Sequence, residues 1–337
     1  MMENRDKKIK AVAMLSGGLD SRLAVRMAQE QGVDVVALNY VTPFCTCTSK
    51  SSCRLEAKKA SIEYGIELKT FYVFEDFIQI IKEPKHGYGR GINPCLDCRI
   101  LMFKKAKDYM DEMGASFLVT GEVIGERPMS QRPDAMITIE NESGLSGLIV
   151  RPLSAKLLRP SIPEERGWVD RKKFLEIEGR SRKPQIEMAE KLGMKDYPCP
   201  AGGCLLTDKD FSLRMRNLLS IVDIPTRNDV FLLKVGRHRF FQGKRIVIGR
   251  NEKENQRISS LAREEDLLLE AEDFSGPTTL IRGKYDNEII MLAAKMTGTY
   301  GKGRDDKKLK IRYWSPKTIE SNYIEIDMVA TEDLVVG

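Results

Sequence analysis

The chain has 337 residues, which is more than a single hydrophobic core usually serves. Its composition, 42% hydrophobic and 31% charged, is typical of a globular protein. Its 55 basic and 49 acidic residues give a formal charge of +6, which permits binding to nucleic acid without requiring it. No apolar run is long enough to cross a bilayer, and the charged opening segment lacks the features of a signal peptide, so we expect a cytoplasmic protein without membrane contact.

Short apolar runs alternate with helical patterns in the first part of the chain. Strands are expected at residues 9–15, 33–40, 67–74 and 116–122, and helices at about 21–31, 54–64 and 97–113. This rhythm predicts an α/β fold, a doubly wound parallel sheet with helices on both faces. Ligands are then expected at the carboxyl ends of the strands.

The pattern changes after Arg151, where the sequence becomes irregular and rich in proline and charge. Residues 172–192 are interpreted as a helix broken at Gly179 and Pro184. Beyond the loop 198–204, we expect strands at VFLLKVG (230–236) and RIVIGR (245–250), followed by shorter helices. We therefore predict two domains, residues 1–204 and a smaller α+β domain at residues 205–337.

Six consecutive residues between the first strand and the first helix spell SGGLDS: Ser16, Gly17, Gly18, Leu19, Asp20 and Ser21. Glycines let the backbone fold around phosphate oxygens, and the start of a helix attracts anions. The serine hydroxyls can donate further hydrogen bonds, and Asp20 is suited to holding Mg²⁺. The loop is neither a Walker loop nor a GxGxxG motif, and it predicts binding of ATP with Mg²⁺. The alternative is a tight turn without a ligand.

Cys95 and Cys98 form a CxxC pair at the expected start of a helix, where the helix dipole is expected to lower thiol pKa values. Cys204, or Cys199 as the alternative, offers a third thiolate from the loop 198–204. Three thiolates favour a [4Fe-4S] cluster with one iron left open. Zinc completed by both Cys199 and Cys204 is one alternative, and catalytic thiols without a metal are another.

Three further cysteines, Cys45, Cys47 and Cys53, follow the second expected strand. We interpret them as ordinary intracellular thiols, with a sulfur relay or a redox pair as the alternative. Basic residues gather at residues 151–183 and again at 237–250. Either cluster is suited to following a phosphate backbone, and a solvated charged surface is the alternative.

The loop SGGLDS, the CxxC pair and the stretch Thr120-Gly121-Glu122 together resemble the PP-loop domain of tRNA 4-thiouridine synthetases. Ser130-Gln131 and Gly125 extend this resemblance, which covers roughly the first 200 residues. It implies the PP-loop or HUP-like fold of the adenine nucleotide alpha hydrolases, which cut ATP between the α and β phosphates. It also implies that Gly121 and Glu122 contact ATP.

Residues 205–337, which include GRHRFFQGKRIVIGRNEKEN and GPTTLIRG, resemble the NFACT-type RNA-binding domain, and this resemblance implies tRNA as a partner. The THUMP and rhodanese domains of familiar synthetases are not visible, so free sulfide or a persulfide-carrying protein is the expected sulfur donor.

We therefore expect a tRNA sulfurtransferase that forms 4-thiouridine, with Cys95, Cys98, Cys204 and Asp20 as catalytic residues. The alternatives are a 2-thiouridine synthase, a PP-loop amide ligase and a non-catalytic RNA-binding protein of ribosome quality control.

Overall fold

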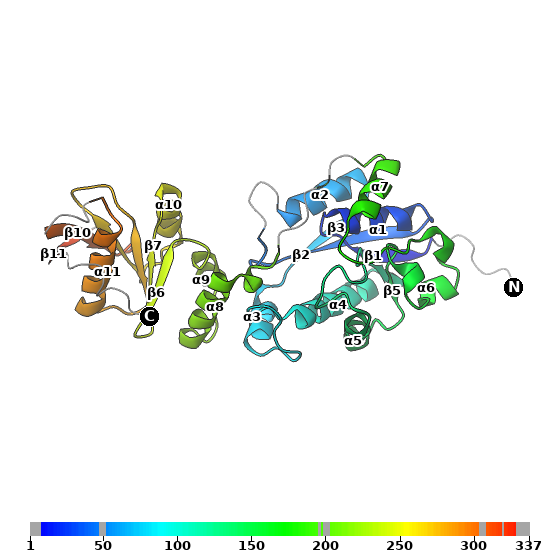
Figure 1. Cartoon of the computed structure of the whole chain (residues 1–337), viewed down its shortest axis with the longest axis horizontal. Coiled ribbons are helices and arrows are strands. Elements are labelled where there is room, and N and C mark those ends of the chain that lie inside the picture. The colour runs from blue at the N-terminus through cyan, green and yellow to red at the C-terminus, as the bar shows by residue number, and fades with distance from the viewer. Residues whose placement is uncertain are drawn as a thin grey trace. The chain divides into compact units, whose positions relative to one another are not determined.

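The computed structural model describes residues 8–46, 52–194, 197, 203–302, 308–318 and 320–327. The chain divides into two compact units, Met1–Asp208 and Lys209–Gly337 (Figure 1). The short 3-10 helix η3 (Leu205–Thr207) ends the first unit, so the structural division lies just after the boundary expected from the sequence. Within the described ranges, no helix combines the length and apolar character needed to cross a membrane.

A five-stranded sheet forms the centre of the first unit, in the order β3-β2-β1-β4-β5. Its strands are β1 (Lys10–Met14), β2 (Asp34–Val41), β3 (Leu68–Tyr72), β4 (Phe117–Val119) and β5 (Ile149–Val150). The pairs β1–β2, β2–β3, β1–β4 and β4–β5 are all parallel. The chain continues from β1 to β2 on one side and returns to β4 on the other, and ligands bind doubly wound sheets at such a switch point.

Helices cover both faces of this sheet, as alternation along β1 requires. Ala11 and Ala13 lie in the core shared with α1 (Leu19–Gln29), α2 (Cys53–Glu63) and α7 (Lys183–Lys191). Val12 lies in the core shared with α4 (Cys95–Glu112) and α5 (Pro133–Ser143). Figure 1 shows these two helix layers on opposite sides of the sheet, which confirms the expected α/β class. The remaining helices of the unit are α3 (Phe74–Lys82), α6 (Ile162–Glu165), η1 (Ala155–Leu157) and η2 (Arg171–Lys173).

The second unit contains an antiparallel sheet in the order β11-β10-β8-β9-β7-β6. Its strands are β6 (Arg237–Phe241), β7 (Lys244–Ile248), β8 (Leu267–Ala271), β9 (Thr279–Arg282), β10 (Lys308–Trp314) and β11 (Asn322–Asp327). Its helices are α8 (Lys209–Ile221), α9 (Arg227–Leu232), α10 (Glu252–Leu261) and α11 (Asn287–Thr299). One face of the sheet packs against α11 and the other against α9 and α10, so the expectation of a separate α+β unit is confirmed.

The segment VFLLKVG is not the strand that its apolar run predicts. Most of it lies in α9 and the turn that follows this helix. Thr226 and Asp229 form a capping box, because the Thr226 side chain accepts from the Asp229 amide and the Asp229 carboxylate accepts from the Thr226 amide. Pro184 is likewise part of a helix start, since it lies in the first turn of α7 and does not break a longer helix.

Candidate active site

The phosphate loop, residues 16–21, lies between β1 and α1 at the switch point of the sheet. Gly17 has a φ of +82°, and a Cβ atom there would lie 2.5 Å from the backbone of Glu56 and Ala57 in α2. Only glycine therefore lets the loop approach α2 this closely. The Ser21 hydroxyl lies 3.1 Å from the Ser16 hydroxyl and donates to the Gly18 carbonyl at 2.9 Å. Both predicted serine donors are thus brought together within the loop.

Asp20 lies in the first turn of α1, and its Oδ2 atom is 3.4 Å from Nη2 of Arg182 at the start of α7. Burial raises the pKa of Asp20, and the charge of Arg182 opposes this effect. Among the described residues, the buried Oδ1 atom of Asp20 has no hydrogen-bond partner. An unpaired carboxylate oxygen beside a phosphate loop fits a Mg²⁺ ligand. The sequence indicates Arg182 only as one member of a basic cluster.

Gly121 and Glu122 follow β4, the neighbour of β1 in the sheet. A Cβ atom at Gly121 would lie 2.5 Å from the Asp20 carbonyl oxygen, so this glycine packs directly on the first turn of α1. The Glu122 side chain is instead 2% exposed and forms ion pairs with Arg99 and with Nε of Arg151, the latter at 2.9 Å. Burial alone would raise the pKa of Glu122, but the two arginine charges lower it. Glu122 is therefore ionised, and Arg99 and Arg151 bind its carboxylate.

The cysteine site consists of Cys95, Cys98 and Cys204. Cys95 and Cys98 lie in the first turn of α4. Burial raises the pKa of Cys98, and negative charge on Cys95 or Cys204 raises it further. Burial also raises the pKa of Cys204, to about 11, with a further contribution from Cys95. The three thiols therefore interact. The expectation that the helix start lowers thiol pKa values is wrong for Cys98, because burial outweighs the helix dipole.

Hydrogen bonds between distant segments hold Cys204 in the cysteine site. The Leu205 amide donates to the Phe44 carbonyl at 2.8 Å, and the Thr46 hydroxyl donates to the Gly203 carbonyl at 2.9 Å. Cys45 and Cys204 form an isolated antiparallel bridge at the same place. The loop before α4 is attached to this segment too, since the Ile92 amide donates to the Leu206 carbonyl at 3.0 Å.

Cys45 and Cys53 also belong to this region, although no sequence motif groups them with the other thiols. Their Sγ atoms are 3.5 Å apart, and negative charge on Cys45 raises the pKa of Cys204. Their position after β2 is the one sequence signal that points here. Cys47 and Cys199 lie outside the described residues. Cys204 is therefore the third thiol that the described structure brings to Cys95 and Cys98.

The thiols of the cysteine site are suitable metal ligands, but their present arrangement does not form a metal site. Thiols that raise one another's pKa values suit a metal centre, because the positive charge of the metal stabilises the thiolates. Among the described side chains, however, no group of three or more His, Cys, Asp or Glu residues is arranged to hold a metal ion. Binding of a cluster or of zinc would therefore require these side chains to move.

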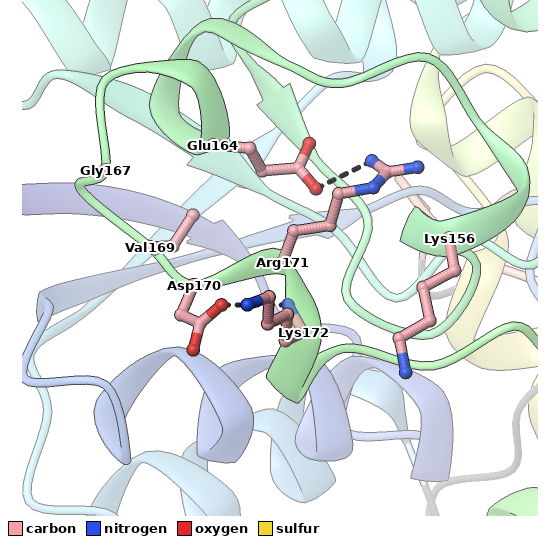
Figure 2. A pocket seen from close by; sticks show the side chains of 7 residues that line it. All are labelled: Lys156, Glu164, Gly167, Val169, Asp170, Arg171 and Lys172. Atoms are coloured by element: carbon pink, nitrogen blue, oxygen red, sulfur yellow. Dashed lines mark hydrogen bonds and ion pairs between the residues drawn. The ribbon is translucent and has the colours of Figure 1, made fainter.

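Ion pairs neutralise part of the first basic cluster. Arg151 is 4% exposed and also pairs with Glu140. Arg171 and Glu164 line a pocket of about 550 Å³, and Nη1 of Arg171 lies 2.9 Å from Oε1 of Glu164. Figure 2 shows this ion pair at the pocket. Lys156 and Lys172 are exposed and line the same pocket. Unlike the buried Arg151 and the paired Arg171, these two lysines are exposed and are therefore available to contact phosphate.

The second basic cluster is also partly internal. Arg245 is 1% exposed, and its Nη2 atom lies 2.9 Å from Oδ1 of Asp229. Burial lowers the pKa of Arg245 to about 10, against the charge of Asp229. The guanidinium of Arg237, in contrast, lies 4.5 Å from the ring centroid of Tyr300, which is 41% exposed. Arg245 is thus a core residue, and Arg237 with Tyr300 is the better candidate for contacting nucleic acid.

Residues 7–156 match the family model described as thiamine biosynthesis protein (ThiI), and residues 236–335 match the NFACT protein RNA binding domain. Residues 7–156, called the ThiI-family segment below, are thus similar to one family, and residues 236–335 are similar to an NFACT-type RNA-binding domain. The ThiI-family segment carries the phosphate loop, Gly121 and the CxxC pair, whereas Cys204 lies beyond it.

Curated relatives also match part of the chain. The tRNA-specific 2-thiouridylase MnmA of Leptospira interrogans is 31% identical over 133 residues, which cover 34% of this chain and 34% of that protein. The probable tRNA sulfurtransferase of Thermococcus kodakarensis is 30% identical over 148 residues, or 43% of this chain and 36% of that protein. The chain spans about a third of the length of the first curated relatives that it matches.

Solved structures are also similar to this chain. A 4-thiouridine synthetase in complex with RNA and ATP is 23% identical with a TM-score of 0.39, and the match covers 55% of this chain and 41% of that one. The U34-tRNA thiolase NcsA from Methanococcus maripaludis with its [4Fe-4S] cluster is 22% identical with a TM-score of 0.33, and covers 68% and 72%.

Proposed function

We propose that this protein is an ATP-dependent tRNA sulfurtransferase that adenylates a uridine and replaces its carbonyl oxygen with sulfur, giving 4-thiouridine. The observation that carries the proposal is that the phosphate loop and the cysteine site are connected within one unit. Gly121 packs on the first turn of α1, and its neighbour Glu122 is paired with Arg99, which directly follows Cys98. A group that activates the substrate and a group that holds sulfur are both required for such a reaction.

The phosphate loop would bind the ATP phosphates in this proposal, and Asp20, whose buried Oδ1 atom has no hydrogen-bond partner among the described residues, would hold Mg²⁺. Arg182 supplies a positive charge near the pyrophosphate that leaves. The uridine O4 atom attacks the α phosphorus, pyrophosphate leaves, and the oxygen is carried as an AMP ester. Because AMP is a good leaving group, sulfur can then displace it from the ring carbon.

Cys95, Cys98 and Cys204 hold the sulfur for this second step. A [4Fe-4S] cluster bound by three cysteines would supply one iron without a protein ligand, at which the sulfur to be transferred can bind. The alternatives are a site that binds zinc and a site without metal, in which the thiols themselves carry the sulfur as a persulfide.

Metal analysis distinguishes these forms. We expect anaerobically purified native protein to contain iron and acid-labile sulfide, and the Cys98→Ala variant to lose both. Cys53→Ala serves as the matched control and retains them, because Cys53 is not among the three proposed ligands. Zinc, or a native protein without metal, would contradict the cluster and favour the other forms.

Nucleoside analysis by mass spectrometry tests the reaction itself. Incubation of unmodified tRNA with the protein, ATP, Mg²⁺ and sulfide is expected to give 4-thiouridine together with AMP and pyrophosphate. Cys98→Ala should still bind ATP but no longer thiolate tRNA. A Cys98→Ala variant that thiolates tRNA at the native rate would contradict the role of the cysteine site.

The match to an NFACT-type RNA-binding domain supports tRNA as the partner, and free sulfide or a persulfide-carrying protein is the proposed sulfur donor. A 2-thiouridine product is the second candidate, favoured by relatives described as tRNA-specific 2-thiouridylases. The same nucleoside digest separates the two products. Ammonia incorporation would indicate an amide ligase, and the absence of ATP-to-AMP turnover with any RNA would favour a non-catalytic RNA-binding protein.

A further inference from the structure

Cys45 and Cys53 form a thiol pair whose geometry permits a disulfide. Their Sγ atoms are 3.5 Å apart, so small changes of side-chain torsion bring them to the bonding distance of about 2.05 Å. Both residues are partly exposed, which leaves them accessible to a reactant from solvent. Cys45 also forms the bridge with Cys204, and therefore connects Cys53 with the cysteine site.

Neighbouring contacts fix both members of this pair. Phe44, next to Cys45, is 1% exposed, and its ring centroid lies 5.4 Å from that of Phe77. On the other side, the Ser52 hydroxyl caps α2 by accepting from the Leu55 amide at 3.2 Å, so that Cys53 begins the helix. The first turns of the same helix pack against Gly17 of the phosphate loop. The pair is therefore held between the phosphate loop and the cysteine site.

We propose that Cys45 and Cys53 take up sulfane sulfur from a persulfide donor and release it as hydrosulfide beside the cysteine site. This inference rests on the proposed function for the use of the sulfur, but not for its uptake and release. It identifies the residues at which sulfur from the donor would enter the protein, whereas the sequence does not specify the donor.

The chemistry proceeds in three balanced steps. The Cys45 sulfur attacks the outer sulfur of the donor persulfide, the donor S–S bond breaks, and the donor leaves as a thiol while Cys45 carries the persulfide. Cys53 then attacks Sγ of Cys45, forming the Cys45–Cys53 disulfide and releasing hydrosulfide. A dithiol reductant returns the pair to two thiols by supplying two electrons and two protons, and is itself oxidised to a disulfide.

The positions of the two sulfurs determine their roles. Cys45 is the acceptor because it adjoins Cys204, so that hydrosulfide is released next to the residues that use it. Cys53 is the resolving residue because its Sγ atom lies within 3.5 Å of that of Cys45. Free sulfide needs neither residue, since it can reach the cysteine site directly.

The test compares two sulfur sources with the full chain, without added reductant. Glutathione persulfide is added to the reduced native protein, hydrosulfide is trapped with a bimane reagent, and the protein is mapped by mass spectrometry. We expect one equivalent of hydrosulfide and a Cys45–Cys53 disulfide, seen as the loss of two hydrogens from the peptides concerned. Cys45→Ser and Cys53→Ser should lose both the disulfide and the stoichiometric release.

Thiolation of tRNA provides the second readout. With sulfide, Cys45→Ser and Cys53→Ser should thiolate tRNA at the native rate, which also shows that they are folded; with glutathione persulfide, their thiolation should be lost. Cys98→Ala is the converse control, expected to form the disulfide but not to thiolate. A native protein that forms no Cys45–Cys53 disulfide, or serine variants that use the persulfide as well as native protein does, would overturn the inference. Failure of native protein to thiolate with sulfide would instead overturn the proposed function.

Discussion

Glu122 carries a buried negative charge that two arginine side chains, Arg99 and Arg151, balance. Glu122→Gln removes that charge and leaves the arginines without their main partner, which is expected to lower the free energy of unfolding of the first unit by about 3 to 5 kcal/mol. Urea unfolding can be followed by Trp168 fluorescence in a Trp314→Phe background, because the chain has two tryptophans and Trp168 packs in the first unit.

Glu30 provides the control for this measurement. It pairs with Arg26 on the exposed face of α1 at 3.1 Å, and Glu30→Gln should change stability by no more than about 0.5 kcal/mol. Equal effects of Glu122→Gln and Glu30→Gln would show that the buried network does not support the fold.

Gly17 and Gly32 permit a matched comparison of the phosphate loop, since both have a φ of +82°. A Cβ atom at Gly32 would meet nothing within 4 Å, so Gly32→Ala reports backbone strain alone, about 1 to 2 kcal/mol. Gly17→Ala adds a clash with α2 and should also abolish ATP binding, measured by isothermal titration calorimetry. ATP binding by Gly17→Ala equal to that of Gly32→Ala would contradict the assignment of the loop.

The functional residues that can be predicted from the sequence are those that lie near one another in it and form a motif. The loop SGGLDS and the CxxC pair are recognisable because their chemistry is local to a strand end or a helix start. Arg182 and the Cys45–Cys53 pair are not, because tertiary contacts bring them to the site: Thr46 and Gly203, for example, are separated by 157 positions. The raised pKa of Cys98 cannot be predicted for the same reason, because a sequence motif does not show how deeply a thiol is buried.

Strand β6 contains His238, which makes the stability of the second unit depend on pH. Burial, together with Arg214 and Arg245, lowers the pKa of His238 to about 3. The unfolded chain therefore gains a proton below about pH 6.5 that the folded chain does not, and the free energy of unfolding should fall by up to about 1.4 kcal/mol per pH unit as pH decreases. The contribution of neutral His238 to stability is thus complete above about pH 6.5 and is lost progressively below it.

Urea unfolding of the second unit from about pH 7.5 to about pH 5, on either side of the ordinary histidine pKa, checks this expectation, with Trp314 as the reporter in a Trp168→Phe background. His86, the other histidine of the chain, lies in the first unit, so the slope reports on His238. His238→Gln should flatten the pH dependence. An unchanged slope in that variant would show that His238 is not its source.

Elements with a clear period or an isolated apolar run are predicted well, as β1, β2, α2 and α4 illustrate. The error at α9 arises because a short apolar run fits a strand or a buried helix equally, and the cap formed by Thr226 and Asp229 decides between them. Helix α3 is not predicted, because it directly follows the apolar run of β3 in the sequence. Phe77, Ile78 and Ile81 nevertheless follow helical spacing and are buried.

At the scale of the whole molecule, we expect Lys156 and Lys172, the exposed lysines at the pocket in Figure 2, to contact phosphates of the tRNA. Lys156→Glu combined with Lys172→Glu should weaken tRNA binding and reduce the slope of log Kd against log salt by about 1 for each phosphate that the variant no longer neutralises. Filter binding over a range of salt concentrations measures both quantities. Lys58→Glu, on the exposed side of α2, is the control, and an equal loss of affinity there would indicate an effect of net charge alone.

Chain length, the change of pattern after Arg151 and the resemblance of each half to a different family all indicate two units from the sequence alone. The structure divides the chain at Asp208 because η3 is hydrogen-bonded to the first unit, through the Leu205 amide and the Phe44 carbonyl. The glycine-containing loop at residues 198–204 carries no sign of that attachment, since hydrogen bonds between distant segments have no sequence period.

The origin of the oxygen in AMP tests the central claim most directly. A tRNA transcript labelled with ¹⁸O at the uridine O4 position is incubated with native protein, ATP, Mg²⁺ and sulfide, and the AMP is analysed by mass spectrometry. We expect one ¹⁸O atom in AMP for each 4-thiouridine formed, because the uridine oxygen leaves bound to the α phosphorus. Unlabelled AMP alongside 4-thiouridine would contradict adenylation of the base, and with it the proposed mechanism.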